Sequence, residues 1–290
     1  MKSLTLGRYV PYKSAIHKLD PRIKLFGLIL LMVAVFIKFT SVEMNFIMYG
    51  VIFVVILILL LLSHINPLAL FKQLKALWLM IVFLLVINVL MPGDPAYGFW
   101  DIGFMKIYFS AIYQTLYIVI RLILMVGLTM ILTSTTRPLD LTYALEWYLT
   151  PLKVIRFPTH EIAMTISIAL RFIPTLLDET NRIMKAQESR GVDFKNGKLG
   201  EKIRAVVSLI VPLFISAFQR SEELANAMEA RGYDPGAKRT RYRVMTWKFR
   251  DTLALIFVVL FFTGVILVSV FDINFITVFA SIWPVIVGWF

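Results

Sequence analysis

The sequence predicts an all-α polytopic membrane protein with about five or six transmembrane helices and a cytoplasmic or interfacial layer of long helices. Of its 290 residues, 59% are hydrophobic, and the mean hydropathy of +0.79 is too high for a soluble domain. The apolar residues gather in long runs, whereas most charged residues lie in one central region. The chain has no cysteine and its three histidines are far apart, so disulfides are excluded and we expect no metal site.

Residues 1–133 are predicted to form an N-terminal arm and four transmembrane helices. The arm ends near residue 24, and its basic residues place it in the cytoplasm by the positive-inside tendency. Apolar runs at 25–39 and 46–62 predict a helical hairpin across the membrane. A third span, 76–91, is expected to stop at a Pro-Gly-Asp-Pro turn, followed by an aromatic outer loop.

The fourth predicted span, residues 107–133, carries Arg121 well inside it. A charged side chain at the centre of a span costs about 3 kcal/mol on insertion scales, so it usually faces protein or water and often has a function. Alternatively, the run tilts or begins at the interface, and Arg121 extends toward the headgroups. The sequence leaves both alternatives open.

Residues 134–250 form a basic region that we place in the cytoplasm. It holds 19 of the 30 lysines and arginines and 12 of the 18 acidic residues. Because acids alternate with bases beside membrane segments, we do not expect nucleic-acid binding. Residues 139–152 predict a short amphipathic helix, and the basic, aromatic run at 237–250 is expected to lie at anionic headgroups.

Two long helical runs with a common plan lie within this region, at 159–190 and 200–231. Each has an apolar first half, then a proline, Pro174 or Pro212, and then an amphipathic half. Charged residues interrupt or follow the apolar halves, so we predict helices that lie along the membrane face. A rival topology, in which both apolar halves cross the membrane, stays open.

Both runs end in the same short sequence motif. Ser189-Arg190-Gly191 recurs as Ala230-Arg231-Gly232, each time after a glutamate and shortly before an aspartate. The glycine predicts a left-handed residue at a helix C-terminus, so each helix would present its arginine at the end. A single copy could be only a helix stop, since cations suit that end of the helix dipole. Two copies, each with a small residue before the arginine, predict two docking tips that pair with carboxylates.

Residues 251–290 are predicted to form a C-terminal transmembrane region. The run 252–271 is a clear span, whereas 274–290 contains Pro284 and is short for a span. Whether that last run returns to the cytoplasm is undecided.

No pattern predicts catalysis, so we expect neither an enzyme nor a cofactor bound by this chain. The segment from Gly191 to Leu199 approaches a phosphate-binding loop, but it has one residue too many between its glycines and leucine where Ser or Thr is required. The clear spans have few ionisable groups apart from Arg121, whereas ion-coupled carriers tend to place acids or histidines at depth.

Taken in order, these motifs resemble those of the T component, the transmembrane coupling protein of energy-coupling factor (ECF) transporters. The resemblance covers roughly residues 12–250. The stretches that carry it are Ser14–Leu25, Thr135–Leu141, Pro151–Lys153, Ala169–Pro174, Ala186–Gly191 and Leu224–Tyr233. Two features depart from the family pattern: Ser189 stands where alanine is commoner, and the last 20 or so residues add an apolar run with no assigned role.

The resemblance implies a subunit of a prokaryotic ABC-type importer of vitamins or other micronutrients, set in the cell membrane with its N-terminus and coupling region in the cytoplasm. It would join two ATPase subunits, which bind the ATP, to a small substrate-binding membrane subunit, the S component. It further implies that Arg190 and Arg231 end two coupling helices, each docking in a groove on one ATPase. The S component would rest on the apolar faces of these helices. Candidate residues for that contact are Arg171, Pro174, Pro212, Phe214 and Phe218.

Two other functions stay open at this point. A stand-alone permease or channel would transport by itself, although the scarcity of polar residues along the spans argues against it. A scaffold for membrane enzymes would share the docking tips but would need no ATPase.

Overall fold

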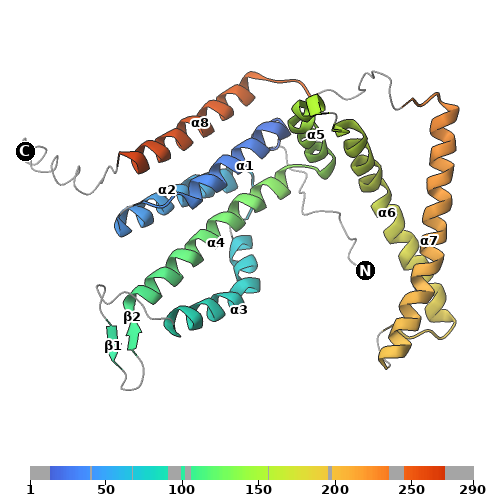
Figure 1. Cartoon of the computed structure of the whole chain (residues 1–290), viewed down its shortest axis with the longest axis horizontal. Coiled ribbons are helices and arrows are strands. Elements are labelled where there is room, and N and C mark those ends of the chain that lie inside the picture. The colour runs from blue at the N-terminus through green and yellow to red at the C-terminus, as the bar shows by residue number, and fades with distance from the viewer. Residues whose placement is uncertain are drawn as a thin grey trace, which may run out of the picture. The chain divides into compact units, whose positions relative to one another are not determined.

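The computed structural model describes residues 14–39, 41–66, 68–90, 99–101, 106–155, 157–194, 198–234 and 245–271. Their regular secondary structure is helical except for one short hairpin, which confirms the predicted all-α class. The chain divides into two compact units (Figure 1). The first unit falls within residues 1–137 and 245–290, and the second within 138–244.

The first unit is a bundle of helices. They are α1 (Pro21–Phe36), α2 (Val42–Leu62), α3 (Leu68–Leu90), α4 (Phe109–Thr135) and α8 (Phe249–Val270). Strands β1 (Phe99–Asp101) and β2 (Lys106–Tyr108) pair antiparallel between α3 and α4, in the segment predicted as an outer loop. In Figure 1, α1, α2, α4 and α8 run alongside one another, with α4 against α1, α2 and α3, and α1 against α8.

Four helices of the described chain are long and apolar enough to cross a membrane. The qualifying segments are Glu43–Leu62, Ser110–Thr135, Thr159–Ser189 and Phe249–Val270, and Leu77–Leu90 is a shorter apolar helix. The first predicted span corresponds to α1, whose 16 residues extend about 24 Å, less than the roughly 30 Å hydrocarbon core. By length and composition the segment Thr159–Ser189, predicted as interfacial, also qualifies as a span.

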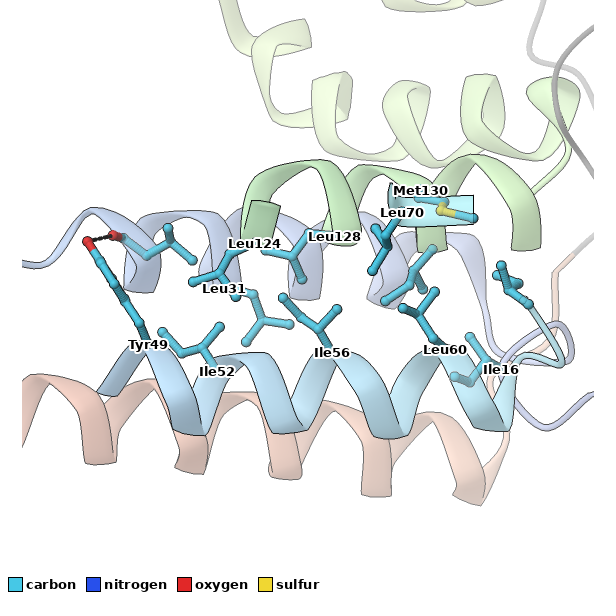
Figure 2. Packing of buried hydrophobic residues seen from close by; sticks show 13 residues of the cluster. Ile16, Leu31, Tyr49, Ile52, Ile56, Leu60, Leu70, Leu124, Leu128 and Met130 are labelled. Atoms are coloured by element: carbon cyan, nitrogen blue, oxygen red, sulfur yellow. Dashed lines mark hydrogen bonds between the residues drawn. The ribbon is translucent and has the colours of Figure 1, made fainter. Parts of the chain in front are cut away.

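The core of the first unit lies between α1, α2 and α4, as Figure 2 shows. Ile52, Ile56 and Leu60 recur along one face of α2 and meet Leu124 and Leu128 of α4. The two helices approach closely at Gly127. A Cβ placed there would lie 2.9 Å from Cγ2 of Ile56, so only glycine fits without a shift. Glycine at this position therefore sets the spacing of α2 and α4.

Buried polar groups join three helix ends of this unit. Asp20 caps α1 by accepting from the Arg22 N–H at 2.9 Å. Asp251, in the first turn of α8, accepts from the N–H of Asp20 and of Lys248, both at 2.9 Å. Lys24 donates to the carbonyl of Thr135, the last residue of α4, at 3.0 Å. The starts of α1 and α8 and the end of α4 are thus tied together.

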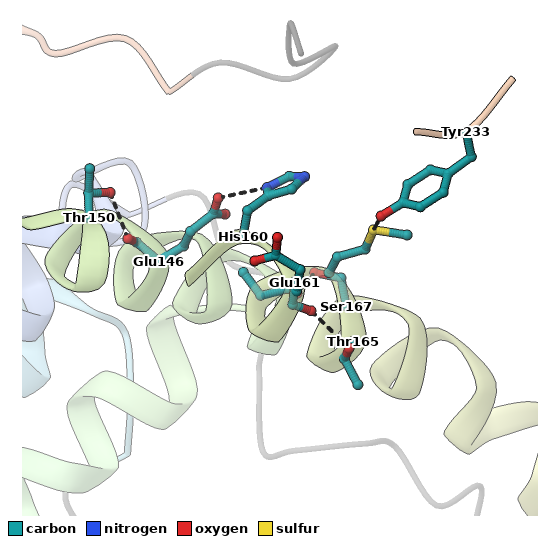
Figure 3. A network of polar contacts seen from close by, with 9 residues as sticks. Glu146, Thr150, His160, Glu161, Thr165, Ser167 and Tyr233 are labelled. Atoms are coloured by element: carbon teal, nitrogen blue, oxygen red, sulfur yellow. Dashed lines mark hydrogen bonds and ion pairs between the residues drawn. The ribbon is translucent and has the colours of Figure 1, made fainter. Parts of the chain in front are cut away.

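The second unit contains α5 (Pro138–Leu149), a 3-10 helix (Thr150–Ile155), α6 (Thr159–Ser189) and α7 (Leu199–Ala230). Both long helices continue through their prolines, Pro174 and Pro212. α6 packs against α5 and α7. Figure 3 shows that the α5–α6 contact includes His160, whose Nδ1 lies 3.2 Å from Oε1 of Glu146.

Several predictions fall on residues outside the described ranges. These are most of the N-terminal arm (1–13), the Pro-Gly-Asp-Pro turn, the middle of the near phosphate-binding loop (195–197), most of the basic aromatic run (235–244) and the last apolar run (272–290).

Candidate docking site at the ends of two long helices

The end of α6 forms a complete C-terminal cap. The N–H of Gly191 donates to the carbonyl of Glu188, and the N–H of Val192 reaches back to that of Gln187, both at 3.0 Å. This pair of hydrogen bonds requires a residue in the left-handed conformation. Gly191 is that residue, with φ +87°. Arg190 is the C-cap residue, so the predicted position of this arginine at the helix end is confirmed.

The end of α7 repeats this geometry. Gly232, with φ +70°, donates to the carbonyl of Glu229 at 2.8 Å, and Tyr233 donates to that of Met228 at 3.0 Å. Arg231 is the C-cap residue, as Arg190 is on α6. The two copies of the sequence phrase therefore build two copies of one structure.

Both arginines are left available for a partner. Ser189, Arg190, Gly191, Ala230, Arg231 and Gly232 are all exposed. Among the described residues, neither guanidinium makes a hydrogen bond or an ion pair. Each carries five N–H donors in a planar fork that matches a carboxylate. The small residue before each arginine leaves room for another surface to approach.

The two tips lie at opposite ends of one helical pair. α6 and α7 pack against each other, and Tyr233, just beyond the end of α7, donates its hydroxyl to Sδ of Met164 near the start of α6 at 3.4 Å (Figure 3). The helices are therefore antiparallel. Since α6 has 31 residues, it extends about 46 Å, which separates the two tips widely.

An apolar stripe runs along the exposed side of α7. The residues recur at spacings of three or four, which places them on one helical face. They are Ile203, Val206, Val207, Ile210, Val211, Phe214, Ile215 and Phe218. Phe214 and Phe218 are 69% and 65% exposed, although both are large and apolar. Such a surface is typical of a site that another molecule covers.

The five residues predicted for S-component contact differ in accessibility. Phe214 and Phe218 belong to the stripe, and Arg171 and Pro174 of α6 are exposed. Pro212 is only half-buried, so less of its ring is available. The contact itself stays a prediction.

Arg121, whose role the sequence left open, turns toward the protein. Its Nη2 lies 3.1 Å from the Tyr49 hydroxyl and 2.6 Å from that of Tyr117. Its Cζ lies 4.7 Å and 5.0 Å from the ring centroids of Tyr117 and Phe36, within the range of cation–π attraction. The Tyr49 hydroxyl in turn donates to the carbonyl of Val35 at 3.2 Å, a bond drawn in Figure 2. The arginine thus connects α1, α2 and α4 without any carboxylate among the described residues.

Sequence reasoning missed Asp251. It lies just before the predicted span 252–271 and was given no role, yet it is 2% exposed and accepts two backbone N–H bonds. An acidic residue in the first turn before a long apolar run is the signal that could have identified it as a cap.

Comparison with known proteins agrees with the motifs. Residues 12–242 match the family model CbiQ, described as cobalt transport protein. The chain is 42% identical over 256 residues to the energy-coupling factor transporter transmembrane protein EcfT of Macrococcus caseolyticus, covering 88% of this chain and 94% of the relative. It is 41% identical to the protein of that name from Bacillus subtilis, with the same coverage. It is 43% identical to that from Limosilactobacillus fermentum, covering 88% of this chain and 93% of the relative.

The family-model match includes α1 to α4 and the two arginine-tipped helices, and the relatives are named as transporter membrane components. The chain therefore belongs to the family of transmembrane components of energy-coupling factor transporters.

Proposed function

We propose that this chain couples ATP hydrolysis by two cytoplasmic ABC-type ATPase subunits to movement of a small substrate-binding membrane subunit, for uptake of vitamins or other micronutrients. The observation that carries the proposal is the repeated helix end. Two matching caps each present an exposed arginine that has no partner among the described residues, and the antiparallel packing of α6 and α7 puts them at opposite ends. One chain can therefore hold two ATPases at once.

Each arginine would enter a groove on one ATPase and pair with an acidic group there. A guanidinium and a carboxylate form two parallel hydrogen bonds, which fix orientation as well as distance. When the pair is buried by docking, removing one partner costs about 3–5 kcal/mol, because the other charge is left without compensation. The two tips would then have to follow any movement of the ATPases to which they are bound.

The helices carry that movement to the apolar stripe of α7. An α-helix is stiff along its axis, and α6 and α7 each continue for more than 30 residues without a break. Closure of the ATPases on ATP would displace the tips and shift the stripe with them. An S component resting on Phe214, Phe218 and their neighbours would tilt and release its substrate inward.

The test is a detergent pull-down of the chain expressed with its ATPases and S component. Arg190→Glu, Arg231→Glu and the double variant are compared with Arg182→Glu, which reverses an exposed arginine two turns earlier on α6. We expect each single variant to retain less ATPase, the double variant to retain none and Arg182→Glu to behave like the native chain.

The proposal fails if the double variant retains as much ATPase as the native chain. Transport by the purified chain alone in proteoliposomes would instead favour a stand-alone permease. Co-purification of other membrane enzymes without any ATPase would favour a scaffold.

A further inference from the structure

An apolar cavity of ≈ 130 Å³ lies within the first unit, between α1, α2, α4 and α8. Sixteen residues line it, and apart from Lys24 and Thr135 they are apolar or glycine. A water molecule needs two to four polar partners, which this surface does not offer over most of its extent. The cavity is therefore suited to hydrocarbon.

The cavity lies entirely toward one end of the bundle. Its lining comes from the first turns of α1 and α8 and the last turns of α2 and α4, for example Ile23, Leu59, Ile131 and Ala254. From Ile23 to Leu31 the lining on α1 extends about 12 Å, close to the roughly 15 Å depth of one hydrocarbon leaflet. A lipid chain entering from that leaflet would run parallel to the helices.

Basic residues are frequent in the two described segments that lead into α1 and α8, at the end of the bundle where the cavity lies. The segments 14–24 and 245–251 contain five lysines and arginines but only two aspartates. Both aspartates, Asp20 and Asp251, are buried and accept from backbone N–H groups, and Asp20 also pairs with Arg22 at 3.7 Å. Lys24 lines the cavity and holds its ammonium beside the carbonyls of His17 and Thr135, at 3.3 Å and 3.0 Å. An anionic headgroup would meet positive charge at the level where the apolar lining ends.

We propose that this cavity is a binding site for an anionic phospholipid, with an acyl chain between α1, α4 and α8 and its phosphate beside Lys24. Lipid tails fill the apolar space because dispersion contacts with the lining replace a void. The ammonium of Lys24 then selects for negative headgroups. The lipid would also cover the contact in which Asp20, Asp251 and Lys24 connect the three helix ends.

The site is tested by native mass spectrometry of the full-length chain in detergent, titrated with phosphatidylglycerol or with phosphatidylcholine of the same acyl chains. We expect phosphatidylglycerol to bind more tightly by about five-fold, the effect of one lysine near a membrane surface. Lys24→Gln should remove that preference and Lys24→Arg should keep it. Lys72→Gln changes an exposed lysine on α3 and should have no effect.

A second variant avoids the hydrogen bonds of Lys24. Ala254 lines the cavity from α8, and Ala254→Trp would fill the space and lower binding of both lipids while the helix ends stay joined. Equal binding of the two lipids to the native chain would overturn the proposal, as would unchanged phosphatidylglycerol binding in Ala254→Trp. Because no ATPase takes part in this experiment, its failure would leave the coupling function untouched.

Discussion

The two units of this chain differ in how their charged side chains are paired. In the first unit, Asp20, Asp251, Lys24 and Arg121 all turn to partners within the same unit. In the second, Arg190 and Arg231 have no partner among the described residues. The first unit satisfies its own polar groups, whereas the second leaves strong binding groups unused. This difference supports the proposal that other subunits bind to the second unit.

The largest effect is expected at the two arginine-tipped helix ends, where ATPase docking is proposed. Arg190→Glu with Arg231→Glu should lower ATPase affinity by about a hundred-fold or more and abolish ATP-driven uptake, because two docked pairs become repulsive. Uptake is measured in proteoliposomes that contain the complete transporter. The melting temperature of the isolated chain should not change, since both side chains are exposed. A double variant that unfolds early would mean that the arginines stabilise the chain itself.

The next largest effect is expected in the first unit, where hydrogen bonds of Asp20, Asp251 and Lys24 connect the starts of α1 and α8 with the end of α4. Asp251→Ala should lower the free energy of unfolding by about 2–4 kcal/mol, because the buried N–H of Asp20 and the partly buried N–H of Lys248 lose their acceptor. Thermal unfolding in detergent measures it. Asp178→Ala, at an exposed site on α6, is the control and should change stability by less than about 0.5 kcal/mol. An equal loss of unfolding free energy in Asp251→Ala and Asp178→Ala would show that the hydrogen bonds of Asp251 do not stabilise the first unit.

A smaller effect is expected at the closest helix contact. Gly127→Ala should destabilise the first unit by about 1–3 kcal/mol, because its Cβ would overlap the Ile56 side chain. Gly50→Ala on α2 is the matched control. It has open space around it and should be neutral, or stabilising by up to about 1 kcal/mol. Chemical denaturation of both variants in detergent gives the comparison, which fails if Gly127→Ala is as stable as Gly50→Ala.

The smallest effect should come from the arginine inside the membrane bundle. Tyr49→Phe removes an acceptor for Arg121, and Arg121→Met removes the charge while keeping similar volume. A double-mutant cycle on unfolding free energy should give a coupling of about 1 kcal/mol. Additive single effects would show that the phenol and the guanidinium do not stabilise each other.

The sequence predicted most of the helices because their signals are local. Apolar runs, prolines and the Arg-Gly phrase predicted α2, α4, α8 and both long helices within a few residues of their bounds. The left-handed glycines followed from the same phrase, since only glycine adopts that conformation readily. The predicted docking roles of the arginines stay predictions until partners are tested.

Other features could not be read from the sequence because they depend on residues far apart in the chain. The bond from Asp20 to Asp251 spans 231 positions, and the partners of Arg121 come from α1 and α2. The hairpin β1–β2 was missed because a three-residue strand has too short a pattern to distinguish from a loop. The assignment of α6 to the interface rested on Arg171, yet its overall length and apolar content also fit a span.

We propose that one chain holds two ATPases, one at each arginine-tipped helix end. The native sequence contains no cysteine, so a single thiol can be placed by Ser189→Cys or Ala230→Cys and labelled with a photoactivated cross-linker. Ser221→Cys, exposed in the body of α7, is the control. In the assembled transporter we predict that each tip position cross-links to an ATPase and that a chain with both thiols captures two ATPase molecules, while position 221 captures none. Capture of one ATPase by both tips, or of no ATPase by either, would contradict the account.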